Sequence, residues 1–421
     1  MAENEWKKNV HALRSVTDLE NFDDLQPLKE VFKSVRIVGL GEATHGTREF
    51  FQLKHRLLAF LVKEMGFRAF LIEAGSLPCQ NINDYVLYGK GDRHAALASQ
   101  GYWTWDTEEV RDMIEWMRQF NLSCQREEMI QFIGYDIKPV EEAYGHLKRL
   151  LPAEALEMAG IDEIKALMDK DALTPEEHEE VKERILKLNG IVQLRDQEIR
   201  AAVGQKGLEL AQHCANMLWQ DYGGMKAEPY SLVGRDKSMA ENTIDIMRQL
   251  PTDSKVVVWA HNAHIAIDPE WTNLGFRLRE AYGDQYYPAA LTFTQGGFQS
   301  RYIHSEVNHN YEMGDLQEFV VGEPMDNYWE KELKDFAQGD YYLDFRPYQK
   351  QADFQDWAMN RELAMFGAGG GFVPFEDQTH GEEYFSKSAI GKQFDGVFHI
   401  QSTTRARPNP TGMRVRGQKS K

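Results

Sequence analysis

Short apolar runs alternate along this chain with stretches that have the apolar spacing of a helix, and this alternation restricts the fold more than any other feature. The runs cover residues 35–40, 69–72, 129–133, 256–259, 289–293 and 397–400. Runs of about four to six residues, rich in β-branched and aromatic side chains, are typical of strands buried on both faces. Between the first two runs, helical spacing is shown by Phe50, Leu53, Leu57, Phe60 and Leu61. The pattern predicts an α/β fold with a mainly parallel sheet flanked by helices.

The region from 141 to 249 breaks this alternation. It is rich in Glu, Lys, Leu and Ala, and Val181, Ile185 and Leu188 would share one helical face. We therefore predict an α/β core at 1–140 and 250–402 with a helical insertion at 141–249. The insertion could act as a lid over a substrate or could simply pack as helices. Residues 403–421 are basic and are predicted to form a flexible tail, with an anion-binding arm as the alternative.

Charge and composition exclude several classes of protein. The net charge of −18, from 48 Lys and Arg against 66 Asp and Glu, argues against general nucleic-acid binding because phosphates are repelled. No run of about 18 apolar residues is present, so we expect no membrane-spanning helix. The first residues lack the apolar segment of a secretory signal, and Cys79, Cys124 and Cys214 are too widely spaced for a disulfide framework. These features favour a cytoplasmic protein.

Acidic and imidazole side chains follow four of the six apolar runs. In chain order they are Glu42 and His45, then Glu73, then Asp136, then His261 and His264. Ligands of open α/β sheets bind outside the carboxyl ends of the strands, so these side chains are expected at one edge of the sheet. Taken singly, each has a structural explanation, since Glu42 could favour the start of a helix and Asp136 could cap a turn. Their repetition after four runs indicates a site.

The residue types in this set suit the activation of water. A histidine titrates near neutral pH and can take a proton from water. A carboxylate beside it can fix its tautomer, and a second histidine can donate to a developing oxyanion. The Gly-x-Ser-x-Gly nucleophile elbow is absent, and no cysteine directly ends a run. No activated side-chain nucleophile is evident, so water is the expected attacking group on an acyl carbon.

Two alternatives use the same side chains. The first is a zinc or other divalent metal site, although the His-Glu-x-x-His pattern is missing; its ligands would be Glu42, His45, Glu73, His261 and His264. The second is a dinucleotide site, because residues 39–44 read Gly-x-Gly-x-x-Thr after a predicted strand. That pattern lacks its third glycine, and Glu42 would place negative charge at a pyrophosphate. We expect no cofactor, with one divalent metal such as zinc as the alternative.

Six segments of the sequence resemble the erythromycin esterase family. They read GLGEATHGTREF at 39–50, FLIEA at 70–74, YWTWDTEE at 102–109, RDKSMAEN at 235–242, WAHNAHI at 259–265 and FDGVF at 394–398. The first and fifth segments are the most specific, and the resemblance extends from about residue 30 to residue 400. It implies an α/β core with a helical insertion. It also implies hydrolysis of a macrolactone ester by histidine-activated water, without a metal.

The resemblance implies roles for individual residues as well. His45 would be the general base, and Glu42 and Glu73 would orient and polarise it. His261 and His264 would line the same cleft and assist the carbonyl or leaving oxygen.

Five further residues are candidates for substrate binding: Lys54, Arg235, Trp103, Trp105 and Asp136. Lys54 matches a position at which some esterases carry arginine, and it could instead be a solvated helix lysine. Arg235 could anchor an anion or a carboxylate, or it could form a structural salt bridge. The two tryptophans could form an aromatic wall for a bulky substrate or pack in the core.

We therefore expect a hydrolase that opens a macrolactone ring, a reaction linked to macrolide antibiotic resistance. Many members of the family are not known to open any macrolide, so hydrolysis of another small-molecule ester is the first alternative. The second alternative is a protein that binds a small ligand or a metal without turnover.

Overall fold

In a computed structural model the protein is described over residues 5–170, 172–226, 232–307, 310–374 and 384–410. The chain forms two compact units. The first comprises Met1–Ile72, Asn81–Ile133 and Ile246–Lys421, and the second comprises Glu73–Gln80 and Gly134–Asp245. Strands β3 (Ala69–Gly75) and β4 (Gln131–Asp136) begin in the first unit and end in the second.

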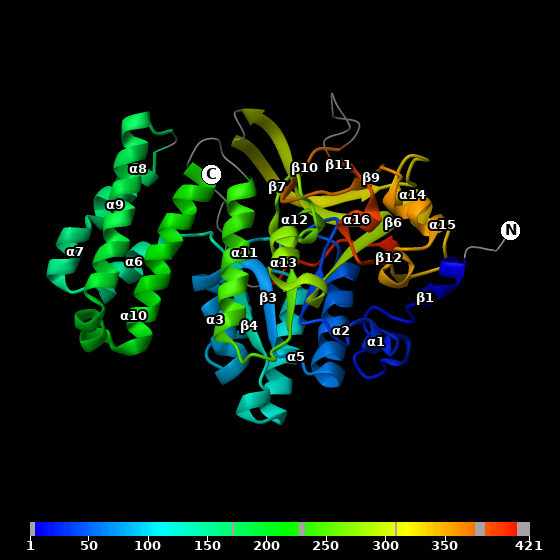
Figure 1. The fold of residues 1–421 in the computed structure, drawn as a ribbon, viewed down its shortest axis with the longest axis horizontal. Helices are drawn as coiled ribbons and strands as arrows, with labels where there is room; N and C mark the ends of the chain where they lie inside the picture. Colours follow the sequence, from blue (N-terminus) through cyan, green and yellow to red (C-terminus); the bar gives the residue numbers. More distant parts are fainter. Residues whose placement is uncertain (1–4, 171, 227–231, 308–309, 375–383, 411–421) are drawn as a thin grey trace. The chain divides into compact units, whose positions relative to one another are not determined.

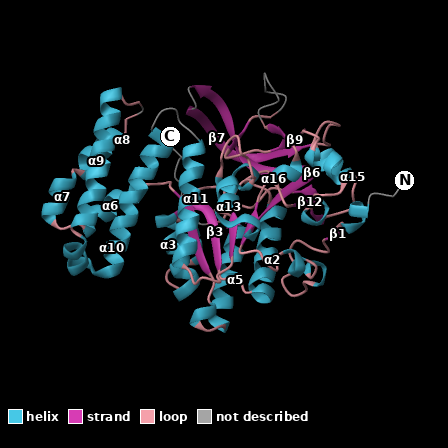
Figure 2. Ribbon diagram, viewed as in Figure 1, coloured by secondary structure: helices cyan, strands magenta, loops and turns pink. Residues whose placement is uncertain are grey.

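One large sheet organises the first unit, and Figure 2 distinguishes its strands, in magenta, from the helices. In order across the sheet come β1 (His11–Ala12), β8 (Tyr341–Asp344), β12 (Gly396–Thr403), β6 (Tyr286–Val307), β2 (Ile37–Leu40), β5 (Val256–Trp259), β3 and β4. Strand β2 is parallel to its neighbours β5 and β6, and the pairs β3–β5 and β12–β6 are parallel too. Strand β8 pairs antiparallel with both of its neighbours, β12 and the edge strand β1. The predicted α/β fold with a mainly parallel sheet is confirmed.

All six predicted apolar runs overlap strands of this sheet, although residues 35–36 precede β2 and residues 129–130 precede β4. Four strands of this sheet were not predicted, namely β1, β8, β7 (Asn310–Val321) and β10 (Gly371–Phe372), and only the first part of β6 was predicted. β7 pairs antiparallel with the second half of β6, where polar side chains are frequent, so neither segment is a continuous apolar run. Two further short strands complete the described set: β9 (Leu363–Phe366) and β11 (Phe385–Ser388).

The helices of the first unit agree with the predicted apolar spacing. Its longer helices are α2 (Arg48–Met65), α5 (Glu108–Ser123) and α13 (Leu274–Tyr282). The short ones are α1 (Leu28–Val31), α4 (Arg93–Ala98), α12 (Asn262–Ile265), α14 (Trp329–Lys334), α15 (Ala352–Phe354) and α16 (Ile390–Gln393). Helix α2 ends at Gly66, whose φ of 75° is the left-handed conformation that glycine adopts without strain. No helix among the described residues is long and apolar enough to cross a membrane.

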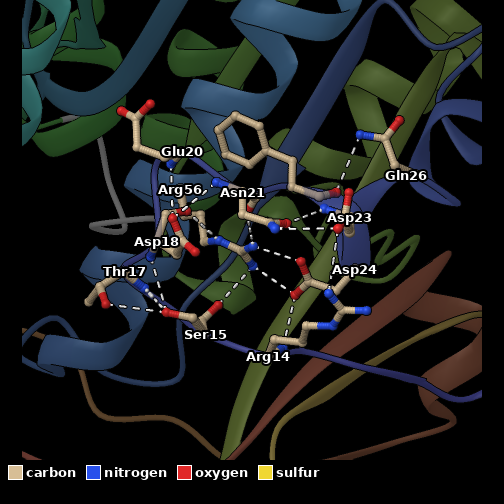
Figure 3. Close-up of polar contacts among 11 residues, drawn as sticks. Arg14, Ser15, Thr17, Asp18, Glu20, Asn21, Asp23, Asp24, Gln26 and Arg56 are labelled. Carbon is tan, nitrogen blue, oxygen red and sulfur yellow. Dashed lines mark hydrogen bonds and ion pairs between the residues drawn. The ribbon is translucent and has the colours of Figure 1, made fainter.

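Helix α2 carries three consecutive basic residues that are all buried, Lys54, His55 and Arg56. The Arg56 guanidinium lies inside the N-terminal segment of the chain, as Figure 3 shows. It donates to both carboxylate oxygens of Asp24 and to three backbone carbonyls, those of Ser15, Asp18 and Asn21. All of these bonds lie between 2.7 and 2.9 Å. Arg56 therefore holds the segment from 15 to 24 against α2.

The second unit is helical, and its helices lie side by side (Figure 1). They are α6 (Glu141–Leu150), α7 (Ala153–Ala159), α8 (Ile161–Met168), α9 (Pro175–Leu194) and α10 (Asp196–Asp221), and α3 (Ser76–Tyr88) and α11 (Leu232–Gln249) each belong to it in part. The residues predicted to share a helical face, Val181, Ile185 and Leu188, are buried on α9. Leu77 of α3 joins the same apolar core. The unit therefore takes in residues 73–80 besides most of the predicted insertion.

The predicted flexible tail at 403–421 needs a correction at its start. Residues 404–409 are bound to the first unit through their backbone, with Arg48 N–H donating to Thr404 O and Ala406 N–H to Gly46 O. The side chain of Asn409 is buried and donates to a carboxylate oxygen of Asp106 at 2.8 Å. These bonds, rather than the basic composition, decide the conformation. The remainder, 411–421, lies outside the described residues.

Candidate active site

The loop that follows β2 is held tightly on both sides. A Cβ on Gly41 would lie 2.0 Å from the side-chain oxygen of Asn262, and a Cβ on Gly46 would lie 1.9 Å from the carbonyl oxygen of Gln299. The backbone N–H of Gln299 donates to Gly46 O at 3.0 Å, and that of Asn262 donates to Glu42 O at 2.9 Å. Only glycine fits at these two positions. The loop is therefore a fixed platform for the side chains between them.

Glu42 is the centre of a buried polar network on this platform. One carboxylate oxygen lies 2.6 Å from His45 Nδ1. The other accepts from Lys54 Nζ and from Trp259 Nε1, both at 2.7 Å. The side chains of Glu42 and Lys54 are wholly buried, and the Lys54 ammonium lies over the Trp259 ring, 4.1 Å from its centroid. Both oxygens of the carboxylate are thus hydrogen-bonded, one to a single partner and the other to two.

The network sets the protonation of the pair. Burial acts to raise the pKa of Glu42, but the Lys54 ammonium and the His45 ring outweigh it and lower that pKa below its ordinary value. Glu42 is therefore an anion that can only accept, so His45 donates from Nδ1. Its Nε2 is then the basic nitrogen. The His45 side chain keeps 11% of its exposure, whereas Glu42 keeps none.

His261 faces His45, with the two ring centroids 5.2 Å apart. It is the N-cap of α12, and its Nδ1 accepts from the backbone N–H of Ala263 at 3.2 Å. A backbone N–H can only donate, so the proton of the neutral His261 ring lies on Nε2. That nitrogen is 3.2 Å from Ala43 O. His264 follows in α12 and is mostly buried.

The predicted tryptophans lie just before α5. The Trp105 ring meets the His45 ring edge to face, with centroids 5.8 Å apart, and it meets Tyr102 at 5.7 Å. Trp105 is almost fully buried, and Trp103 is nearly so. The Trp105 carbonyl accepts from Thr107 N–H at 2.9 Å, which fixes the turn into α5. Trp105 therefore bounds one side of His45.

Lys54 does not lie where a substrate-binding residue was predicted. Its side chain has no exposed surface and its ammonium bonds Glu42, so it is not placed to contact a substrate. Burial of a lysine without a partner is costly, and the pair with Glu42 is the physical reason for its position.

Three other predicted residues come together in the second unit. Arg235 donates from Nη2 to Glu73 at 2.8 Å and to Asp136 at 2.7 Å, and its Nε donates to the other oxygen of Asp136 at 3.2 Å. Burial acts to lower the pKa of Arg235, but Asp136 and Glu73 raise it well above its ordinary value. Asp136 also accepts from the backbone N–H of Ile137 at 2.7 Å. Two carboxylates thus already compensate the charge of the guanidinium. Arg235 therefore forms a structural salt bridge, which was the predicted alternative to binding an anion.

The family model for erythromycin esterase matches residues 62–403, which is most of the chain. The chain belongs to the erythromycin esterase family. Membership of the family supports an ester-hydrolase function. The resemblance carried by the six sequence segments is thereby confirmed.

Similar proteins agree with this assignment. The chain is 25% identical to erythromycin esterase type II of Escherichia coli over 95% of its own length and 97% of that protein. A crystal structure of a succinoglycan biosynthesis protein matches with a TM-score of 0.74 and 24% identity, over 95% of this chain and 96% of that one. A mutant of the erythromycin esterase EreC in its open conformation matches with a TM-score of 0.67 and 16% identity, over 94% of this chain and 98% of that one. The two structures show that the fold is shared.

Sequence reasoning missed one member of the network, Trp259. It closes an apolar run, so it is expected only to pack in the core, yet its indole N–H bonds Glu42. The available signal was its position, because Trp259 is the first residue of the family-like segment at 259–265 that contains His261.

A metal site was the alternative use of these side chains. Among the described residues, no group of three or more His, Cys, Asp and Glu side chains is arranged to hold a metal ion. In the first unit the reasons are visible, since the oxygens of Glu42 are bonded to His45, Lys54 and Trp259.

Proposed function

We propose that this member of the family hydrolyses a macrolactone ester with a water molecule that His45 activates, without a metal. The observation that carries the proposal is the buried carboxylate of Glu42, which bonds His45 Nδ1 at 2.6 Å and leaves Nε2 as the basic nitrogen. This is the arrangement of a general base held by an acidic partner. The substrate class rests on the name of the relative from Escherichia coli and on the aromatic side of the site at Trp105.

In the proposed reaction, the oxygen of water forms a bond to the carbonyl carbon of the ester while His45 Nε2 takes a proton from that water. The tetrahedral intermediate then breaks its bond to the ring oxygen. The leaving oxygen receives the proton back from His45, and the ring opens to a hydroxy acid. Water is the only co-reactant, so the product gains the mass of one water.

Glu42 has two tasks in this scheme. It holds the tautomer that leaves Nε2 free of a proton, and it stabilises the imidazolium that forms when water is deprotonated. Lys54 and Trp259 act through Glu42, because they bond its second oxygen and keep it ionised. They are positioning residues rather than groups that touch the substrate.

His261 is proposed to stabilise the oxyanion. Its Nε2 carries the only ring proton, and the ring lies beside that of His45. In the structure this N–H is directed at Ala43 O across 3.2 Å, a weak bond that a charged oxygen could replace. The predicted roles of Glu73 and His264 toward His45 stay predictions.

Product analysis by mass spectrometry tests the proposal. The protein is incubated with a panel of macrolides and simple lactones, beside the variants His45→Ala and Glu42→Gln. We expect a gain of one water with the unaltered protein, its loss in His45→Ala and a strong decrease in Glu42→Gln. His146→Ala serves as the matched control, because that ring lies on the surface of the second unit.

Two results would contradict parts of the proposal. A folded His45→Ala variant that hydrolyses its substrate at the normal rate would remove His45 as the base. Loss of activity on dialysis against a chelator, with recovery on addition of one divalent ion, would replace the metal-free route. Conversion of a simple lactone but of no macrolide would keep the mechanism and change the substrate class.

A further inference from the structure

A second histidine in the chain is paired with a hydroxyl group, in the second unit. Ser76 Oγ lies 2.6 Å from His213 Nε2, although 137 residues separate the two in the sequence. The other acceptor within reach of the hydroxyl is Met217 Sδ, at 3.6 Å. Both partners are on α10, one turn apart, so one face of that helix surrounds the hydroxyl. At 2.6 Å the hydroxyl is within hydrogen-bond distance of His213 Nε2, which accepts its proton when the ring carries its own proton on Nδ1.

Ser76 lies at a direct junction between a strand and a helix. Strand β3 ends at Gly75, and α3 begins at Ser76 with no intervening loop. A Cβ on Gly75 would lie 2.4 Å from the carbonyl oxygen of Lys138, so only glycine fits at the end of this strand. A serine at a sharp strand-to-helix turn is the setting in which hydrolases present a nucleophilic hydroxyl. The surrounding sequence lacks the Gly-x-Ser-x-Gly pattern, so no motif marks it.

The same turn supplies hydrogen-bond donors. The first N–H groups of a helix have no carbonyl one turn earlier within that helix, and α3 is 13 residues long. Ser76 and Leu77 contribute such groups to the first turn, whereas Pro78 has no N–H. Leu77 and Cys79 are buried, so this turn is anchored by its apolar side chains. A carbonyl oxygen at the Ser76 hydroxyl would meet a helix N-terminus, where negative charge is stabilised.

The protonation of His213 suits a base. Burial lowers its pKa, so the ring is neutral at pH 7 and its Nε2 can accept the serine proton. Among the described residues no carboxylate lies against its Nδ1, so the pair has no third member. Ser76 itself keeps part of its exposed surface. The hydroxyl thus lies beside a neutral imidazole, on a residue that keeps part of its exposed surface.

We propose that Ser76 is a nucleophile activated by His213, and that it accepts the acyl group of a small activated ester. In the step, Ser76 Oγ forms a bond to the carbonyl carbon while His213 Nε2 takes the hydroxyl proton. The bond to the alcohol oxygen then breaks, and that oxygen leaves with the proton from His213. Ser76 is left as an acyl ester, which water can hydrolyse later. This site goes beyond the water activation at His45 and does not depend on it.

Covalent labelling tests the proposal. The full-length protein is incubated with a fluorophosphonate, which transfers its phosphonyl group to an activated serine and releases fluoride. Intact-mass and peptide mass spectrometry then locate the adduct. We expect one adduct per chain, on Ser76, and none in the variant Ser76→Ala. An unlabelled protein, or an adduct on another residue only, would overturn the proposal.

His213→Gln separates activation from mere exposure. Glutamine keeps a polar side chain at this place but is no base, so we expect the rate of labelling at Ser76 to fall at least tenfold. An unchanged rate in a variant that retains its circular dichroism spectrum would overturn the role of His213. Ser238→Ala is the matched control. The hydroxyl of this serine, in the same unit, donates to the carbonyl of Gly234, so we expect the variant to be labelled at Ser76 as fast as the unaltered protein. The assay uses no macrolide, so its failure leaves the proposed lactone hydrolysis untouched.

The pH dependence gives a second readout. Because burial lowers the pKa of His213, its basic form persists to a lower pH than that of an ordinary histidine. We expect labelling of Ser76 to continue below about pH 6.5, the ordinary value for histidine. A steep loss of labelling at or above that pH would contradict a buried neutral base.

Discussion

Lys54 Nζ and Glu42 Oε2 are 2.7 Å apart, in an ion pair of which neither side chain reaches the surface. The pair joins helix α2 to the loop after β2, and through Glu42 it reaches His45. A buried charge is tolerated only when a partner compensates its lost hydration. The lysine is therefore part of the buried network that holds His45.

Replacement of Lys54 by methionine tests this relationship. Methionine fills a similar volume but leaves Glu42 without its cation, and breaking a buried pair in this way costs about 3–5 kcal/mol. We expect that loss in the free energy of urea unfolding, together with a loss of ester hydrolysis. The control is Lys33→Met, because the Lys33 ammonium pairs with Glu30 on the exposed surface. Equal stability of the two variants would contradict a buried, compensated charge.

The sequence predicted the α/β fold and the proximity of several candidate residues in the first unit, because both depend on local patterns. Glu42 and His45 directly follow one apolar run, and His261 directly follows another. Parallel strands bring their carboxyl ends to one edge, so residues that are distant in the chain meet there. The burial of Lys54 could also have been anticipated. Its helical neighbours three and four positions away are all apolar and buried: Phe50, Phe51, Leu57 and Leu58.

Other contacts had no local signal. Trp259 counts as an apolar residue in any pattern, and the direction of its indole N–H depends on where α2 and the β2 loop pack. Ser76 and His213 lie on different helices, and nothing in either segment specifies the other. The tail at 404–409 is basic and contains proline, yet backbone bonds to Gly46 and Arg48 order it. Such contacts are set by tertiary packing, which composition and periodicity do not encode.

Glu330 is expected to make stability depend on pH. It lies buried on α14, one oxygen accepts from Phe366 N–H at 2.9 Å, and the other has no hydrogen-bond partner among the described residues. Burial raises the pKa of Glu330 to about 7 from its ordinary 4.5. Between these pH values the Glu330 carboxyl is therefore protonated in the folded protein and ionised in the unfolded chain. Stability therefore falls as pH rises from 4.5 to 7.

The substitution Glu330→Gln removes this titration. We expect the free energy of unfolding of the variant to match that of the unaltered protein near pH 4 and to exceed it at pH 8 by up to about 3 kcal/mol. Urea unfolding at the two pH values measures the difference. Glu332→Gln provides a control of opposite sign, because hydrogen bonding from Arg361 lowers the pKa of Glu332. A Glu330→Gln variant that is equally destabilised at both pH values would contradict the prediction.

Arg56 is expected to hold the N-terminal segment in place. Its planar fork bonds both oxygens of Asp24 and three carbonyls, which the single ammonium of lysine cannot reproduce. Arg56→Lys should therefore lower the free energy of unfolding by about 2 kcal/mol or more, since buried acceptors lose their donors. Hydrogen exchange of the amides between 14 and 26 should quicken. Arg14→Lys, at the exposed pair with Asp23 in the same region, should change neither quantity (Figure 3).

The structural and the chemical contributions of His261 can be measured separately. Its Nδ1 caps α12 by accepting from Ala263 N–H, and asparagine is a preferred residue for that task. His261→Asn should therefore keep the fold and the thermal midpoint while it removes the Nε2–H beside His45. Removal of one oxyanion donor lowers kcat by about 100- to 1,000-fold in other hydrolases, and we expect a decrease of that order here. A variant with normal kcat would show that His261 serves the helix alone, and the oxyanion of the proposed reaction would need another donor.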